Sequence, residues 1–336
     1  MALYGVGIPD ASVLALQRRL IASLPDVAAR EGGPTLELRA APAEAARCVP
    51  AEPLEGTTLV ARAVGGERVS RFAAFLDGTQ RTTVIAYLRG LPLVHGLVAA
   101  VVRMRRERRL HTWSEGPIIR RLVCAPLAML TASERGAIER TGVDLRDSGD
   151  ELPADATSAH PFTLVERSAA IVEYERERCE QALAERWSDA ERDATLYVDG
   201  GISGSERIAR SDNVVGVVKS HRRLYAEGEG MRIVLGLRAG ERSTVFVVAP
   251  ARRAAVASWY LRLRDPSGHD PMWGLVRVEI ALREDLRRTP SALTTRADEV
   301  SRWVLAEAVP LALPDARWDK MAYGVRDCEE FLRAVV

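Results

Sequence analysis

Cysteine, histidine and long apolar runs are the scarce features of this sequence. The chain has 336 residues with 4 cysteines and 5 histidines. The cysteines lie far apart without a CxxC pair, which argues against a disulfide framework or a zinc knuckle, and the histidines are too scattered for a zinc cluster. No stretch approaches the ~18 consecutive apolar residues that span a membrane, and the N-terminus lacks the basic and apolar regions of a signal peptide. We therefore expect a cytoplasmic protein with reduced thiols and no membrane association.

A net charge of one sign is also missing. The 47 basic and 46 acidic residues leave a net charge of +1. Any site for nucleic acid must therefore be a local patch, because the whole chain provides no electrostatic steering. Apolar residues are plentiful at 47% of the chain, enough for a substantial core. The length fits one large domain or two ordinary ones.

The hydrophobic pattern divides the chain into a short N-terminal part and a longer α/β part. Residues 11–30 repeat apolar positions at helical spacing and stop before Gly32-Gly33, and residues 34–56 are rich in proline and alanine, as in a connector. We assign residues 1–56 to an N-terminal helix and connector, and residues 57–336 to the main domain.

The main domain is predicted to begin with three antiparallel strands and to continue with alternating helices and strands. Gly78-Thr79 and Arg89-Gly90 would form the turns of the first three strands. The predicted strands are 71–77, 82–88, 93–103, 118–123, 194–198, 214–218, 243–249, 256–263 and 274–282, and the predicted helices are 133–142, 164–187, 292–309 and 315–334. This order predicts an RNase H-like mixed sheet flanked by helices, with an N-terminal helical extension.

Two aspartates follow predicted strands, and each precedes a glycine. Asp77 ends the first strand in FLDG, and Asp199 ends the strand TLYVDGG. Glycine allows the chain to turn away and leaves the carboxylate at the edge of the sheet. Either Asp-Gly pair alone would be an ordinary turn. Together they occupy the positions at which an RNase H-like fold places carboxylates, the ligands that Mg²⁺ or Mn²⁺ prefers.

The helices offer further carboxylates. On the long helix, at ~100° per residue, Glu180 lies nearest the edge of the apolar stripe and Glu173 slightly further round. We favour Glu180 as a metal ligand and keep Glu173 in reserve, because most glutamates on so charged a helix are solvated partners of arginines. On the terminal helix, Asp315 is best explained as an N-cap, and Asp319 is the candidate ligand.

Such a set of carboxylates is typical of nucleases that use two divalent ions, in which one ion activates water and the other stabilises the leaving oxygen. Lys219, at the tip of the apolar strand VVGVVKS, is a candidate for holding the scissile phosphate, with a solvated strand end as the alternative.

Basic side chains near these motifs are candidates for DNA contacts. They are Arg222 and Arg223 in KSHRR and Arg262 in WYLRLR, and phosphate contacts of this kind would weaken with salt. For Arg262 an ordinary cross-strand salt bridge is an equal alternative. The run RMRRERR at 103–109 is better explained as a solvated strand end.

The motifs FLDGT, LYVDGGI, VVGVVKS, WYLRL and VRVEI, in this order, resemble those of the NurA nucleases over most of residues 70–335. The resemblance implies an RNase H-like fold, a homodimer, and cleavage of single-stranded and duplex DNA with Mn²⁺. It also implies a HerA-type hexameric ATPase as partner, in DNA repair by end resection or in anti-phage defence. By position, Asp77 and Asp199 match the two aspartates of the family, Glu180 its helical glutamate and Lys219 its lysine.

Two departures from the family pattern accompany this resemblance. The second motif usually reads Asp-Gly-Ser-Leu, whereas residues 199–202 read Asp-Gly-Gly-Ile. The C-terminal helix of the family often carries a histidine, whereas Asp319 takes that place here. An alternative function is therefore a catalytically weak or silent NurA-like subunit that scaffolds a HerA-type motor, although retention of the two aspartates, Lys219 and a helical glutamate favours an enzyme.

A hydrolase of the haloacid dehalogenase type is excluded. FLDGT resembles part of that family's signature, but its nucleophilic aspartate would stand two residues before Asp77, where this chain has Phe75.

Overall fold

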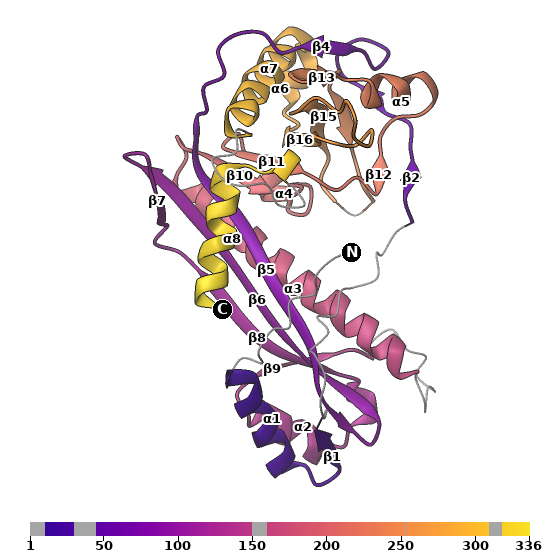
Figure 1. Ribbon diagram of the computed structural model, residues 1–336, viewed down its shortest axis with the longest axis vertical. Coiled ribbons are helices and arrows are strands. Elements are labelled where there is room, and N and C mark those ends of the chain that lie inside the picture. Colours follow the sequence, from indigo (N-terminus) through magenta and orange to yellow (C-terminus); the bar gives the residue numbers. More distant parts are fainter. Residues whose placement is uncertain (1–10, 30–44, 150–159, 252, 309–317) are drawn as a thin grey trace.

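A large mixed sheet flanked by helices forms the protein (Figure 1). The computed structural model describes residues 11–29, 45–149, 160–251, 253–308 and 318–336. The helices are α1 (Ala11–Ser23), α2 (Ala132–Glu139), α3 (Pro161–Ala190), α4 (Glu206–Ala209), α5 (Gly228–Leu235), α6 (Glu284–Arg288), α7 (Pro290–Glu307) and α8 (Tyr323–Val335), with 3-10 turns η1 (Leu127–Met129) and η2 (Trp318–Lys320).

The strands are β1 (Val27–Ala29), β2 (Arg47–Cys48), β3 (Glu52–Pro53), β4 (Ala61–Ala63), β5 (Phe72–Leu88), β6 (Leu91–Arg106), β7 (Arg109–Thr112), β8 (Ile118–Ala125), β9 (Asp144–Asp147), β10 (Thr195–Asp199), β11 (Val214–Val218), β12 (Arg223–Leu224), β13 (Glu241–Ser243), β14 (Phe246–Val248), β15 (Val256–Arg262) and β16 (Leu275–Ala281). The prediction of a mixed sheet flanked by helices is confirmed, with most elements close to their predicted positions.

The centre of the sheet has the order β8-β6-β5-β10-β11. Strands β5, β6 and β8 are antiparallel, while β10 runs parallel to β5 and β11 runs parallel to β10. The sheet continues through β16, β15, β14 and β3, all antiparallel. The carboxyl ends of β10 and β11 therefore meet at one edge, beside the middle of the long strand β5.

Strand β5 corrects the prediction of a turn at Gly78-Thr79. It is one strand of 17 residues that contains both predicted strands, and its pairing with β6 continues through Gly78, opposite Ala100. The sequence TQRTT beyond Gly78 favours the extended conformation, and the neighbouring β6 provides hydrogen-bond partners throughout. The turn occurs only at Arg89-Gly90, where φ is 50° and 82°, as a two-residue hairpin requires.

The two faces of the sheet are covered by different helices. Residues alternate along β5, so Leu76 lies in a buried cluster with Val172 and Leu183 of α3, whereas Phe75 lies in a second cluster with Val325 of α8. Helix α7 also packs on this second face. By the same alternation, Asp77 belongs to the face of α7 and α8, and Gly78 belongs to the face of α3.

The N-terminal helix is shorter than predicted. Helix α1 ends at Ser23, because Pro25 disfavours a helical conformation in the residue before it. It packs through Leu16 and Leu20 against Leu88 of β5, and Figure 1 shows it with α2 at the far end of the long strands. Of the helices in the described ranges, none is long and apolar enough to cross a membrane.

The segment from 47 to 63 returns to the far side of the sheet. Strand β3 pairs with β14, β4 pairs with β13, and β2 pairs with β12. The division of the chain at residue 56 stays a prediction.

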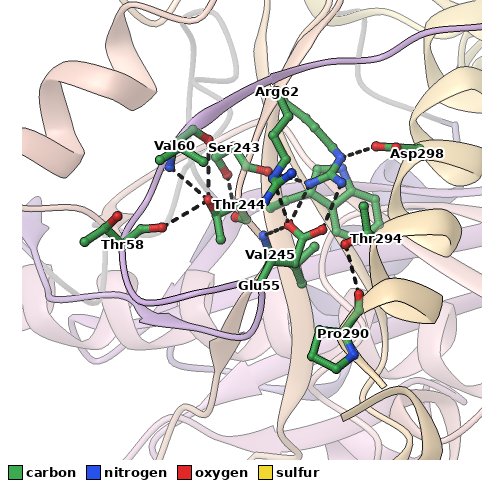
Figure 2. A network of polar contacts seen from close by, with 12 residues as sticks. Glu55, Thr58, Val60, Arg62, Ser243, Thr244, Val245, Pro290, Thr294 and Asp298 are labelled. Atoms are coloured by element: carbon green, nitrogen blue, oxygen red, sulfur yellow. Dashed lines mark hydrogen bonds and ion pairs between the residues drawn. The ribbon is translucent and has the colours of Figure 1, made fainter. Parts of the chain in front are cut away.

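A buried ionic network anchors this segment (Figure 2). Arg242 of β13 is fully buried and donates from Nη1 and Nη2 to the carboxylate of Glu55 at 2.8 and 3.0 Å, and from Nε to Asp298 of α7 at 2.5 Å. Glu55 also accepts from the backbone N–H of Val245 at 2.7 Å. Burial alone would raise the pKa of Glu55, but the hydrogen bonds from Arg242, Thr294 and Val245 and the charge of Arg242 lower it.

Replacing Arg242 with methionine is expected to destabilise the protein by about 3–5 kcal/mol, because the buried Glu55 would lose both of its close guanidinium bonds and keep only Arg62, at 3.8 Å, as a cation. Urea unfolding followed by circular dichroism measures this. The control is Arg232→Met, which removes an exposed ion pair with Glu229 and should cost less than about 1 kcal/mol. Equal losses in the free energy of unfolding for the two substitutions would show that the buried network stabilises the protein no more than an exposed ion pair does.

Candidate functional site

Three of the predicted site residues lie on neighbouring strands. Leu76 of β5 is opposite Val198 of β10, which places Asp77 next to Asp199, and Lys219 follows β11 directly. Lys219 Nζ donates to Asp199 Oδ2 at 2.9 Å, and the two side chains are only 11% and 13% exposed. The predicted Asp-Asp-Lys arrangement is therefore present at one edge of the sheet.

Asp77 is buried and electrostatically crowded. Its Oδ1 accepts a hydrogen bond from the backbone N–H of Gly78 at 2.8 Å. Burial raises the pKa of Asp77 well above its usual range, and the charges of Asp199, Glu180 and Glu329 raise it further, against the opposing charge of Lys219. Asp77 therefore lies in a buried and predominantly negative environment.

Glu180 reaches this site from α3, over Gly78. A Cβ atom at Gly78 would lie 3.0 Å from both Cγ and Cδ of Glu180, so only glycine leaves room for this carboxylate. Gly78 therefore serves close approach and makes no turn, which corrects the expectation that a turn there exposes Asp77. Burial raises the pKa of Glu180 to about 7, although the ion pair with Arg176 lowers it.

The reserve candidate Glu173 does not join the site. It is exposed, nearly two helical turns before Glu180, and no contact links it to the site. Glu177 instead lines a cavity together with Glu180, Asp199 and Arg176. The second glutamate that lies near Glu180 is therefore Glu177, about one helical turn before it, and not Glu173.

The loop that follows Asp199 is fixed by Glu279 of β16, which is itself buried. Oε2 of Glu279 accepts from the backbone N–H of Ile202 at 2.8 Å, and its Oε1 accepts from Arg277 at 2.7 Å. Gly200 has φ +144°, and a Cβ at Gly201 would lie 3.1 Å from Glu279 Oε2. The absence of a side chain at Gly201 thus allows the buried glutamate to approach the loop.

Asp319 lies on η2, before α8 begins, and so corrects its predicted place on the terminal helix. Its Oδ2 accepts from the backbone N–H of Gly274 at 2.7 Å. It shares a cavity of about 470 Å³ with Asp199 and Lys219, but it is not among the charges that shift the pKa of Asp77. Asp315 lies outside the described residues.

Glu329 is a further carboxylate near Asp77 that the sequence analysis did not single out. It lies on α8, its charge raises the pKa of Asp77, and Arg333 is 3.6 Å from its carboxylate. The available signal was the spacing of Val325, Cys328 and Leu332, which are buried and place Glu329 at the border of the apolar face. The predicted helix began too early, at residue 315, and drew attention to Asp319 instead.

Arg262 corrects one of the predicted DNA contacts. It is fully buried and donates to the backbone carbonyls of Leu235, Leu237, Pro271 and Trp273. An arginine with this environment supports loops from inside and does not meet DNA. Arg222 is exposed, and Arg223 is half-buried in β12. The alternative interpretation of Arg262, a salt bridge between strands, is also wrong. Glu279 instead pairs with Arg277 of its own strand.

The site residues are spread over both faces of the sheet edge. Alternation along β5 places Asp77 on the side of α7 and α8, Glu180 comes from α3, and Asp199 lines one cavity with Glu180 and another with Lys219. Within the ranges that the structure describes, no three Asp, Glu, His or Cys side chains stand close enough together to hold a metal ion. Lys219 and Arg176 instead neutralise two of the carboxylates.

Comparisons with known proteins add little to this site. No protein-family model matches the sequence, and no curated protein matches it. Among solved structures, the chain is similar to the crystal structure of the NurA nuclease from Sulfolobus solfataricus, with a TM-score of 0.41 and 12% sequence identity, over 81% of this chain and 85% of that chain. A similarity this weak does not establish a shared fold or activity.

Replacing Gly78 with alanine is expected to destabilise the protein by about 1–3 kcal/mol, because the new methyl group overlaps Glu180. Thermal unfolding of Gly78→Ala, Glu180→Ala and the double variant measures the coupling, and the second substitution should remove most of the penalty. Gly65→Ala is the control, since a Cβ there meets nothing within 4 Å. A stabilising effect of Gly78→Ala would contradict the close approach, because alanine otherwise favours a strand over glycine.

The pKa of Glu180 predicts a pH dependence. Unfolded chains lose this proton near the usual 4.5, whereas the folded protein holds it to about 7, so stability falls as the pH rises from 4.5 to 7. Above pH 7, Glu180→Gln should therefore be more stable than wild type in the absence of divalent ions, by at most about 3 kcal/mol. Below pH 4.5 no gain is expected. Glu173→Gln, at an exposed position of the same helix, should show no such pH-dependent gain.

Proposed function

We propose that this protein is a divalent-metal-dependent deoxyribonuclease of the NurA type with an RNase H-like fold. The observation that carries the proposal is the convergence of Asp77, Glu180, Asp199 and Lys219, which the sequence motifs had singled out from distant parts of the chain, on one sheet edge. The strand order β8-β6-β5-β10-β11, three antiparallel strands followed by two parallel ones, supports the RNase H-like assignment.

The residues suit Mn²⁺ or Mg²⁺ in their chemistry. Their donors are carboxylate oxygens, the ligands that these ions prefer, and a bound divalent cation would oppose the rise in the pKa values of Asp77 and Glu180 that burial and neighbouring carboxylates cause. Asp77 and Asp199 would hold the ion, with Glu180 and Glu329 beside them and Asp319 across the neighbouring cavity. When bound, the ion would supply an activated water and stabilise the leaving oxygen.

Lys219 has two roles in this proposal. In the structure its ammonium group neutralises Asp199 at 2.9 Å. With DNA present, the same group would hold the scissile phosphate and stabilise the charge that develops on it. Arg222, exposed just beyond Lys219, would contact the neighbouring backbone, together with Arg223.

The biological setting is a proposal that rests on the sequence motifs alone. It comprises a cytoplasmic homodimer, a HerA-type hexameric ATPase as partner, and DNA repair or anti-phage defence as the process.

The ion pairs of Asp199 with Lys219 and of Glu180 with Arg176 favour a second candidate. Carboxylates that are paired with internal cations must give up these pairs before they can hold a metal ion. The second candidate is therefore a NurA-like subunit that scaffolds a HerA-type motor and cleaves DNA weakly or not at all.

The test is degradation of labelled single-stranded DNA with Mn²⁺, by the protein alone and with its partner ATPase. Asp77→Asn and Asp199→Asn are expected to reduce the rate at least about 100-fold, because loss of a ligand should exceed the effect of losing its hydrogen-bond support. The matched control is Glu173→Gln, exposed and outside the site, which should cleave as wild type does.

Unchanged cleavage by both asparagine variants would overturn the assignment of the site. Absence of cleavage by the wild type, even with the partner, would favour the scaffold.

A further inference from the structure

Two adjoining cavities meet at the loop after Asp199. The first is lined by Glu180, Asp199 and Arg253 among others, and the second, of about 620 Å³, is lined by Arg210, Arg253 and Arg287 among others. Gly204 and Arg253 line both cavities. A path therefore leads from the carboxylates, past Arg253, into a hollow with three arginines.

Arg253 is held at this junction by its backbone. Its N–H donates to the carbonyl of Pro250 at 3.1 Å, and the next residue, Ala254, donates to the carbonyl of Ser203 at 3.0 Å. The absence of a side chain at Gly204 leaves space there, because a Cβ would lie 2.5 Å from Gln181 Nε2 and 3.9 Å from Arg253 Nη1. The guanidinium of Arg253 thus extends over Gly204, at the boundary of the two cavities.

Two of the three arginines form no ion pair with a carboxylate in the part of the chain that the structure describes. Glu206 pairs with Arg210, and Glu284, the other acidic residue lining the hollow, pairs with Arg288 at the surface. Arg253 and Arg287 are exposed, and within the described ranges neither forms an ion pair. They are available to an anion from solvent.

We propose that Arg253 and Arg287, with Arg210 on the wall of the second cavity, bind the phosphate backbone of single-stranded DNA on one side of the scissile bond. This inference rests on the proposed nuclease function and adds a binding track that the sequence motifs did not indicate. Guanidinium groups match the geometry of phosphate, and backbone contacts carry no sequence information, so the track is independent of sequence. A single strand, unlike a duplex, bends into a hollow beside the carboxylates.

The track lies on the opposite side of Asp199 from Lys219. The first cavity contains Asp199 with Glu180, whereas the cavity that contains Lys219 reaches Asp199 together with Trp273 and Asp319. A strand that crosses the site would thus meet Lys219 at one side of the scissile phosphate and Arg253 at the other.

The experiment is equilibrium binding of a fluorescent single-stranded DNA of about 15 nucleotides to the full chain, with EDTA present to prevent cleavage. Binding is measured by anisotropy over a series of salt concentrations. Arg253→Ala/Arg287→Ala is expected to weaken binding about tenfold or more and to reduce the slope of log K against log salt by about 1.4, since each lost contact to single-stranded DNA contributes about 0.7.

Two further variants sharpen the test. Arg253→Lys/Arg287→Lys keeps the charges but loses the planar fork, and it should recover part of the affinity and most of the salt slope. The matched control is Arg232→Ala, an exposed arginine on α5 away from both cavities, which should bind as wild type does. Unchanged unfolding midpoints establish that the variants are folded.

Equal affinity and equal salt slope of wild type and the alanine double variant would overturn the track, and the nuclease assignment would stand on its own cleavage test. Arginine-dependent binding without cleavage would support the track and count against the nuclease. The same titration with RNA of the same sequence tests whether the bound phosphate backbone is that of DNA or of RNA. RNA binding ten times tighter than DNA would overturn the assignment to DNA.

Discussion

The close contact of helix α3 with strand β5 at Gly78 is the constraint on which the site depends. Gly78 has no side chain to separate the helix from the strand. The carboxylate of Glu180 therefore lies against the backbone of β5, where it is shielded from water. The same contact requires β5 to continue straight through Gly78, which keeps Asp77 inside a paired strand. The position of the helix, the rigidity of Asp77 and the raised pKa of Glu180 thus have one origin.

Electrostatic crowding follows from this packing. Asp77 is influenced by three other carboxylates and only one lysine, and the nearby Arg176 is engaged with Glu180. Burying like charges is costly unless a cation joins them, and the apolar burial on both faces of the sheet offsets this cost. The excess of negative charge is confined to the sheet edge, while the adjoining hollow carries arginines.

Sequence patterns predicted most of the longer elements and singled out two aspartates, a helical glutamate and a lysine that the structure brings near one another, because these follow from periodicity and from short motifs. They misassigned residues whose role depends on distant partners. Gly78 looks like a turn unless the approaching helix is known, and Arg262 looks the same in a strand whether solvent or carbonyls surround it. Asp319 was chosen instead of Glu329 because the terminal helix was predicted to begin several residues before its actual start. Arg253 was not singled out because it lies in a loop whose neighbours come from another part of the chain.

The bond between Glu55 and Arg242 joins positions 187 residues apart. Strands β3 and β4 precede β5 in the chain but pair with β14 and β13, which are synthesised much later. The outer edge of the sheet therefore closes only when most of the chain has left the ribosome, whereas β5, β6 and β8 can pair early. Such long-range pairing slows folding, because the chain loses the entropy of closing a long loop before the strand contacts can stabilise it. The candidate catalytic strand β5 would then assemble before the outer edge of the sheet is complete.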